Sequence, residues 1–520
     1  MTAQLLAGLS VFCIGSRGRA VSILVIALLV VGSFLFYDFH HAVTESVLQQ
    51  NSPNISNLAG FDNTTYYSNT TPTETPKVTD SPVPNQSVIH DVPEAKPNSI
   101  TFFGPVAEQP TPQPTSEPHI VLNVTFLLSA IELLRATGGS IVLQSDLAIN
   151  QDIILPSNIM LTGSNGKITI FLSGHLLGVA ASATNVTFKD LTIDGSGLGD
   201  QAFIIAQNAT NVLVENIIFR NFLGVAGCLL NFGNQVTLRN ISFNNIQNVY
   251  PILINGSNVS VSDCVSSDNS LFPLIAVGGG LSNISVVGNT ASNRPLFSAN
   301  YGIAPTKNLW IENNTVFFPN GTYAVLIMGG MGDYLPISHA NVTVTGNFIK
   351  AAPGAFNAIA IYGLTTNATV IGNTVDMSLS GHNGIAVSSG TNVTVTKNVV
   401  FGSNELTEGG IEVESNPVHN RQVGFSDNVT VVDNTVYNST WGIYVRIMCP
   451  DHPNWNGTVL LSKNIVIENN TVYDCQVGVN LLYGDNLTVR NNNIMSNRVP
   501  FAVDVTNVSN FTVTGNIGYP

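Results

Sequence analysis

Cysteine and basic residues are both scarce in this chain. Its 520 residues include five cysteines, and none forms a C-x-x-C pair, so a zinc knuckle or a thioredoxin-type site has no support. Lysine and arginine number 18 against 32 acidic residues, and the formal net charge is −14. Nucleic-acid binding needs a basic face that neutralises phosphates, so we expect no nucleic-acid partner.

One segment has the length and composition of a membrane span. Residues 20–37 form a run of 18 without charge, long enough to cross a hydrocarbon core of about 30 Å. Arg17 and Arg19 precede it, which places residues 1–19 in the cytoplasm and the rest outside. A cleaved signal peptide is the alternative, but the run is long and no small-x-small cleavage site follows. We expect a single-pass anchor in the cell membrane.

A segment of different composition follows the anchor. Residues 38–118 are rich in Pro, Thr, Ser and Asn, with few periodic apolar residues. Such a segment cannot bury enough surface to offset its ordering entropy, which predicts a disordered stalk that proline stiffens. Its sequons start at Asn54, Asn63, Asn69 and Asn85. We predict glycans there, because no repeat requires Asn at these positions and the chain is expected to be exported.

The segment after the stalk has helical periodicity. Residues 125–137 read TFLLSAIELLRAT, and Gly138 and Gly139 end the pattern. Its apolar residues fall on one predicted helical face: Phe126, Leu127, Ala130, Ile131 and Leu134. A short amphipathic helix before the first strand would cap the open end of a stacked β core.

From residue 140 onward the chain repeats itself. A motif of Asn, an apolar residue, any residue and an apolar residue recurs, in most cases every 22 to 26 residues. It starts at Asn185, Asn211, Asn258, Asn283, Asn308, Asn341, Asn367, Asn392, Asn428, Asn464, Asn486 and Asn510, with Gln235 in one slot. The alternating apolar residues predict short strands with one buried face.

A second Asn lies six positions after the first in the later repeats. The series is Asn289, Asn314, Asn347, Asn373, Asn398, Asn434, Asn470, Asn492 and Asn516. Asn tolerates the left-handed backbone of a tight turn. Stacked turns would let these amides bond to one another along an inner ladder.

Residues 119–520 resemble the pectate-lyase-like superfamily of right-handed parallel β-helices. The resemblance lies in LLRATGGSIVLQSD at the start, LPSNIMLTGSNG at 155–166 and NVTFKDLTIDGSG at 185–197. It implies an all-β solenoid with a capping helix, and it implies proteins that bind or process polysaccharides. One fold hosts many functions, so the resemblance does not determine the activity.

A second strand in each repeat carries the candidate site. Alignment of the repeats predicts two outward columns, Ala386–Glu412–Tyr444–Asn480 and Tyr362–Ser388–Glu414–Arg446–Leu482. Adjacent rungs lie about 4.8 Å apart, so Glu412, Glu414, Tyr444 and Arg446 should form one polar patch. We predict these four as catalytic residues, since carboxylate, Arg and Tyr are groups used in uronate or sugar chemistry. The alternative is a surface ion pair between Glu414 and Arg446 that contributes at most about 1 kcal/mol.

Two long insertions, 415–427 and 447–463, leave from this patch, and long loops beside regular rungs often carry function. We predict that they and a nearby turn supply substrate-binding residues: His382, His419, Arg421, Asp451, His452 and Trp455. Asn383 breaks the Gly-His-Gly pattern of polygalacturonases in GHNG, and CPDHP matches the epimerase Asp-Pro-His-Asp only in part. No cofactor or metal site is evident; calcium stays possible, but no cluster of Asp residues supports it. Cys449 and Cys475 either form a disulfide or remain free thiols.

Two functions remain open. The first is an extracellular protein that binds or processes a polysaccharide, in its sharper form a lyase or epimerase acting on an acidic glycan. The second is a structural or adhesive cell-surface glycoprotein without enzymatic activity. No capping helix follows the last repeat, so either aromatic residues such as Tyr519 or a second copy of the chain would cover that end. We therefore expect self-association there.

Overall fold

The computed structural model describes residues 117–166, 168–197, 202–223, 227–247, 249–301, 305–329, 339–403, 406–415, 424–447, 461–504 and 506–518. The predicted anchor, the four stalk sequons and Tyr519 lie outside these residues. Within them, no helix combines the length and apolar character needed to cross a membrane.

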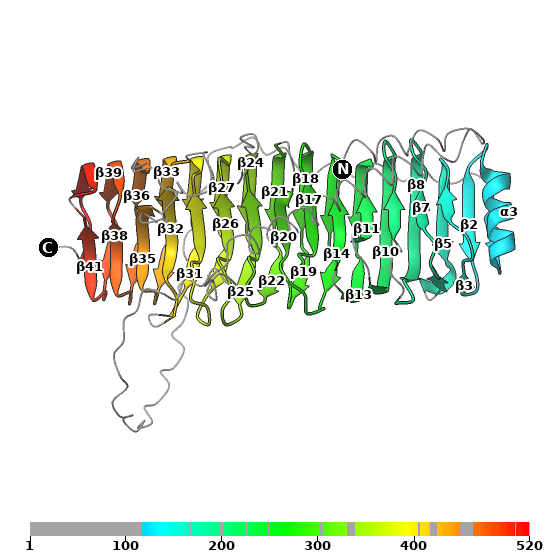
Figure 1. Ribbon diagram of the computed structural model, residues 1–520, viewed down its shortest axis with the longest axis horizontal. Coiled ribbons are helices and arrows are strands. Elements are labelled where there is room, and N and C mark those ends of the chain that lie inside the picture. The colour runs from blue at the N-terminus through cyan, green and yellow to red at the C-terminus, as the bar shows by residue number, and fades with distance from the viewer. Residues whose placement is uncertain are drawn as a thin grey trace, which may run out of the picture. The chain divides into compact units, whose positions relative to one another are not determined.

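The described chain is a parallel β-helix in which each turn stacks on the one before it (Figure 1). A sheet of 14 described strands, sheet B, forms one side. Its strands are β4 (Ile153–Leu155), β7 (Leu177–Val179), β9 (Phe203–Ile205), β11 (Gly227–Asn231), β14 (Tyr250–Ile254), β17 (Ile275–Gly278), β20 (Phe297–Tyr301), β23 (Val325–Met328), β26 (Ile359–Tyr362), β29 (Ile385–Ser388), β32 (Gly409–Ser415), β35 (Trp441–Ile447), β38 (Val477–Leu481) and β41 (Val499–Val503).

Sheet A holds 28 described strands in two adjoining columns. The first column contains β1 (His119–Val121), β2 (Gly139–Leu143), β5 (Ile159–Gly163), β12 (Asn234–Arg239), β15 (Val259–Ser262), β18 (Ser282–Val287), β21 (Lys307–Glu312), β24 (Ala340–Thr345), β27 (Thr366–Ile371), β30 (Thr391–Thr396), β33 (Asp427–Val432), β36 (Lys463–Glu468), β39 (Gly484–Arg490) and β42 (Val508–Thr514). The second contains β3 (Leu147–Ala148), β6 (Ile168–Phe171), β13 (Ser242–Gln247), β16 (Val265–Ser266), β19 (Thr290–Ser292), β22 (Thr315–Phe318), β25 (Phe348–Ala351), β28 (Thr374–Asp376), β31 (Val399–Phe401), β34 (Thr435–Tyr437), β37 (Thr471–Tyr473) and β40 (Asn493–Met495). Two long strands, β8 (Thr184–Asp194) and β10 (Thr210–Leu223), run through both columns.

The first Asn of each repeat starts a sheet-A strand in the left-handed backbone region. Asn392 and Asn428, for example, have φ of 54° and 53°. Their amides form a ladder on the outside of the solenoid, with Asn428 Nδ2 donating to Asn392 Oδ1 at 2.8 Å. The Asn therefore turns the chain, and the alternating residues that follow it bury every second side chain in the core.

The second Asn of each repeat forms the predicted inner ladder. Asn398 donates from its backbone N and from Nδ2 to Asn434 Oδ1, both at 3.0 Å, and the same pattern links Asn434 to Asn470. The prediction that this Asn adopts the left-handed conformation is wrong. The residue before it does so, as at Lys397 with φ of 54° and Asp433 with φ of 56°. That residue reverses the chain and directs the amide that follows into the core.

Helix α3 (Val124–Leu134) lies at the end of the stack beside β1 and β2 (Figure 1). Asn123 caps it by accepting a hydrogen bond from Phe126 N at 3.0 Å. Leu127, Ala130, Ile131 and Leu134 are buried against the core. Phe126, predicted on the same face, is 56% exposed and does not pack against the core.

Candidate functional site

The outward face of sheet B changes character at β32. Ala360 and Ala386 fill one outward column on β26 and β29, and Glu412 and Tyr444 continue it on β32 and β35. The predicted register of both columns is confirmed, and the second column places Ser388, Glu414 and Arg446 side by side. The turn before β32 adds Glu408, and the turn before β29 adds Asn383. We call the following residues the Glu/Arg cluster: Asn383, Glu408, Glu412, Glu414, Tyr444 and Arg446.

Arg446 holds the cluster together through three carboxyl groups. Its Nε lies 2.5 Å from Glu412 Oε1, and its Nη1 lies 2.6 Å from Glu408 Oε1. Glu414 is more distant, with Oε2 at 3.5 Å from Arg446 Nε. The guanidinium also lies over the Tyr444 ring, 5.2 Å from its centroid. One cation therefore serves three acids, and only two of them are hydrogen-bonded to it.

Asn383 joins the two strands from the neighbouring turn. Its Nδ2 donates to Glu412 Oε2 at 2.7 Å, and its Oδ1 accepts from the Tyr444 hydroxyl at 2.8 Å. Its backbone N donates to Asn357 Oδ1 at 2.9 Å, and the Asn357 amide donates to the Tyr362 hydroxyl. This chain of amides carries polar contacts across four rungs of the solenoid.

Gly409 leaves the space that Tyr444 occupies. A Cβ at Gly409 would clash with the Tyr444 ring. The absence of a side chain at Gly409 therefore leaves room for the tyrosine ring of the next rung. The ring is fully buried at this position.

The cluster buries two neighbouring carboxyl groups, which disfavours their charged forms. Glu412 and Glu414 are 1% and 2% exposed, although both point away from the core. Burial raises the pKa of Glu414 well above its ordinary range, and the Glu412 carboxylate acts in the same direction. Glu414 Oε2 has no hydrogen-bond partner among the described residues. Glu414 is therefore the acid of this cluster whose protonated form burial and the neighbouring carboxylate favour.

The other titratable groups of the cluster respond to the same charges. Burial raises the pKa of Glu408, and Arg446 partly offsets this shift. Burial also raises the pKa of the Tyr444 phenol, and Glu412 adds to that shift. For Arg446, burial lowers the pKa, but the nearby carboxylates, Glu412 foremost, outweigh it and keep the guanidinium charged.

Aromatic rings border the cluster on both sides. On the side of the earlier rungs, Phe356 contacts Tyr323 and His382, with ring centroids 5.3 and 5.0 Å apart. On the other side, the Trp441 ring lies 4.8 Å from that of Tyr444. Phe356, His382 and Trp441 are half-buried, so part of each ring faces outward. Burial lowers the pKa of His382, which keeps its imidazole neutral.

The structure brings together five of the ten predicted site residues. Glu412, Glu414, Tyr444 and Arg446 form one network, and His382 lies at its border. His419, Arg421, Asp451, His452 and Trp455 lie outside the described residues. The alternative predicted a surface pair between Glu414 and Arg446. The two groups do face each other at 3.5 Å, but Glu414 is buried and the closest partners of Arg446 are Glu412 and Glu408.

Several members of the site were missed by the sequence analysis. Asn357 and Asn383 occupy the same place in successive repeats, 26 residues apart, and Glu408 lies close to that place in the next repeat. Extending the aligned columns from the strands into the preceding turns would have found all three. Among the described residues, no group of three or more His, Cys, Asp or Glu could hold a metal ion. Cys475 is a buried free thiol in the structure, which favours the free-thiol alternative over a disulfide, and Cys449 lies outside the described residues.

The fold has known counterparts. The family described as "Right handed beta helix region" matches residues 177–349 and 357–518. No curated protein sequence matches the chain significantly.

Solved structures with a similar fold share little sequence with the chain. The A-module of the Azotobacter vinelandii mannuronan C-5 epimerase AlgE6 is 13% identical with a TM-score of 0.43, over 76% of this chain and 95% of that one. A tailspike protein of E. coli bacteriophage HK620 in complex with a hexasaccharide is 14% identical with a TM-score of 0.45, over 75% and 76%. The Streptococcus pneumoniae surface protein and adhesin PfbA is 17% identical with a TM-score of 0.46, over 62% and 95%.

Proposed function

The chain belongs to the right-handed β-helix family, and we propose that it binds a polysaccharide on the outer face of sheet B, at the Glu/Arg cluster. The observation that carries this proposal is the pairing of outward aromatic rings with a charged centre. Phe356, His382 and Trp441 offer apolar surface at the border, while Glu408 and Arg446 remain partly exposed between them. Sugar rings have apolar faces and polar edges, and sites for such ligands combine aromatic walls with a few fixed polar groups.

The charge of the cluster supports a functional role over a purely structural one. A stable ion pair needs one acid for one base, whereas Arg446 faces three acids. Two buried carboxyls side by side destabilise the fold unless one of them is protonated. Perturbed groups of this kind gather at functional sites more often than elsewhere.

The experiment is a glycan array probed with the full chain and with two variants, Trp441→Ala and Phe356→Ala. We expect the wild-type chain to bind at least one polysaccharide and each variant to lose about fivefold in affinity, since a ring contact contributes about 1 kcal/mol. Phe348→Ala is the matched control, because Phe348 is an exposed ring on sheet A. Equal binding by all four proteins would remove the site from the proposal, and a purely structural or adhesive glycoprotein would then be the better reading.

Processing of an acidic polysaccharide, as a lyase or epimerase would carry out, is the second candidate. The observation that favours it is the pair Glu412 and Glu414, because burial raises the pKa of Glu414 and Asn383 links Glu412 to the Tyr444 hydroxyl. Polyuronates incubated with the full chain would be assayed for unsaturated product by ultraviolet absorbance and for epimer composition by NMR. Tyr444→Phe should abolish either product while binding persists. Absence of product from the wild-type chain would leave binding alone.

The proposal includes display outside the cell through an anchor at residues 20–37. A membrane fraction washed with alkaline carbonate should retain the full chain and lose a variant without residues 20–37. Glycosidase treatment should shift the mass of the chain through Asn54, Asn63, Asn69 and Asn85. Self-association through the C-terminal end is also a proposal, and a monodisperse monomer in light scattering at high concentration would contradict it.

A further inference from the structure

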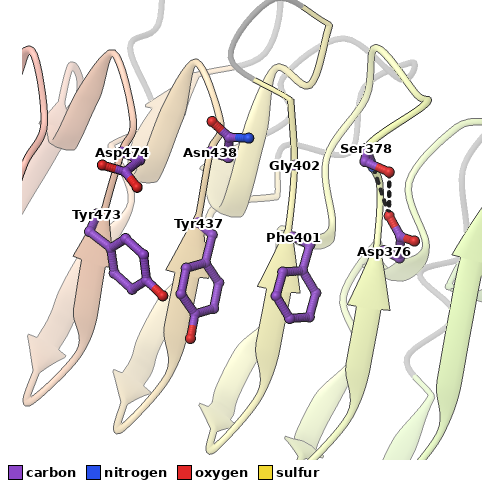
Figure 2. Close-up of a pocket in the computed structure, with 8 residues that line it drawn as sticks. All are labelled: Asp376, Ser378, Phe401, Gly402, Tyr437, Asn438, Tyr473 and Asp474. Atoms are coloured by element: carbon purple, nitrogen blue, oxygen red, sulfur yellow. Dashed lines mark hydrogen bonds between the residues drawn. The ribbon is translucent and has the colours of Figure 1, made fainter. Parts of the chain in front are cut away.

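A second surface feature lies on the same rungs as the Glu/Arg cluster, but on sheet A. It is a groove of about 580 Å³. Figure 2 shows its lining as one outward column with polar residues along the adjoining turn. The column is Asp376, Phe401, Tyr437 and Tyr473, which are register partners on β28, β31, β34 and β37. The polar residues are Ser378, Asn438 and Asp474, with the Gly402 backbone beside them.

The three rings form a ladder that ends in a turned ring. Phe401 and Tyr437 are stacked, with centroids 5.0 Å apart and planes 6° apart. Tyr473 lies 4.0 Å from Tyr437 but stands at 88° to it. Tyr437 thus contacts its neighbours through both faces, whereas the face of Tyr473 is turned away from the stacking direction. Phe401 is 40% exposed and both tyrosines are half-buried, so the ladder presents apolar surface to the groove.

The polar side of the groove is fixed and acidic. Asp376 accepts hydrogen bonds from Ser378 N at 3.1 Å and Ser378 Oγ at 2.6 Å, and Lys350 Nζ lies 3.0 Å from its Oδ2. Burial raises the pKa of Asp376, but the Ser378 and Lys350 contacts outweigh it and keep the carboxylate ionised. Asp474 lies at the other end of the lining, two rungs beyond Gly402. Among the described residues, no Lys, Arg or His lines the groove.

We propose that this groove binds a neutral polysaccharide along the solenoid axis, as a site separate from the Glu/Arg cluster. The turned ring of Tyr473 and the exposed edges of Phe401 and Tyr437 would pack against the C–H groups of successive sugar rings. The carboxylates would accept hydrogen bonds from the sugar hydroxyls, and Asn438 would both donate and accept.

Adjacent rungs lie about 4.8 Å apart, so the groove presents one ring or acid per rung. A polysaccharide running along the solenoid axis likewise presents one sugar per repeat unit. Uronate chains are disfavoured, because Asp376 and Asp474 both line the groove and the one described cation beside them, Lys350, is already paired with Asp376.

The test is isothermal titration calorimetry of the full chain with four probes: cellohexaose, laminarihexaose, mannohexaose and hexagalacturonate. We expect one or more of the neutral probes to bind, and hexagalacturonate to bind the same chain at least about tenfold more weakly. The double variant Tyr437→Ala/Tyr473→Ala should lose about tenfold or more in affinity for the neutral probe, from two ring contacts of about 1 kcal/mol each.

Two further variants separate recognition from folding. Tyr437→Phe/Tyr473→Phe keeps both rings and should bind the neutral probe within about threefold of wild type, which restores what the alanine variant loses. Phe317→Ala is the matched control, because Phe317 occupies the same outward column outside the groove and is 39% exposed. The proposal is overturned if no neutral probe binds, if hexagalacturonate binds best, or if the alanine and phenylalanine variants bind alike.

Discussion

Glu414 offers the sharpest test of the electrostatics at the cluster. Its side chain is 2% exposed, and Oε2 lacks a hydrogen-bond partner among the described residues. Burial, followed by the Glu412 charge, raises its pKa. Glutamine has the shape of a protonated glutamate and can donate to Glu412 as the protonated acid would. The substitution Glu414→Gln should therefore fit the site without rearrangement and remove one titration.

The magnitude follows from proton linkage. A pKa that is raised in the fold stabilises the fold fully only below the pKa of the unfolded chain, ordinarily 4.5 for this group. As the pH rises from there toward the folded-state pKa, the fold keeps a proton that the unfolded chain has lost. Each pH unit in this window lowers the free energy of unfolding by about 1.4 kcal/mol. The free energy of unfolding of Glu414→Gln has no such pH dependence. Relative to wild type, the variant should therefore become more stable by about 1.4 kcal/mol for each pH unit in this window.

Hydrogen exchange of the β32 and β35 amides is the suitable assay, because each rung contacts only its neighbours and opens locally. Comparing the two proteins at equal pH cancels the intrinsic exchange rate. The matched control is Glu468→Gln, which alters a partly exposed acid paired with Arg490 on sheet A. The difference in amide protection between Glu414→Gln and wild type should widen from pH 4 to pH 8. If it does not, Glu414 titrates normally and the reasoning about the cluster fails.

Three further substitutions probe the Glu/Arg cluster and the inner Asn ladder. Arg446→Met leaves three acids without their cation, and we expect a loss of about 3–5 kcal/mol in local stability, measured by the same exchange experiment. Gly409→Ala should displace the Tyr444 ring, which near-ultraviolet circular dichroism would report as a lost aromatic signal; an unchanged spectrum would contradict the clash. Asn434→Ala removes the acceptor for two Asn398 donors and should cost at least about 2 kcal/mol, seen as faster exchange at Asn398 but unchanged exchange at α3.

The sequence was sufficient to predict the register of the site. A glycine precedes the aligned apolar residues of β29, β32, β35 and β38. Alignment therefore placed Glu412 beside Tyr444 and Glu414 beside Arg446, as the strands are paired. The environment of these side chains was not predictable in the same way. A period of two distinguishes inward from outward positions, but it does not reveal that an outward glutamate is buried.

The partners from the turns were also beyond the sequence analysis. Asn383 lies 29 positions from Glu412 and 61 from Tyr444, and the stacking of turns alone brings them together. The aromatic groove left a clearer trace, because Thr-Val-Tyr ends at both Tyr437 and Tyr473. The sequence analysis assigned the left-handed conformation to the second Asn of each repeat, one position too late. The cause is that Asn is favoured both at a left-handed turn and in an amide ladder.

The inner ladder constrains how such a chain can change over evolutionary time. From Asn289 to Asn492, each ladder Asn donates to the turn ahead and accepts from the turn behind, so the acceptor must recur at the same place in each turn. Removing residues 290–314, the 25 residues that follow Asn289 up to and including the ladder residue Asn314, would leave Asn289 opposite Asn347 with the series intact. Removing half as many would leave buried amides unpaired. Duplication and loss of sequence should therefore be tolerated in whole turns, and the length of the solenoid is in effect quantised.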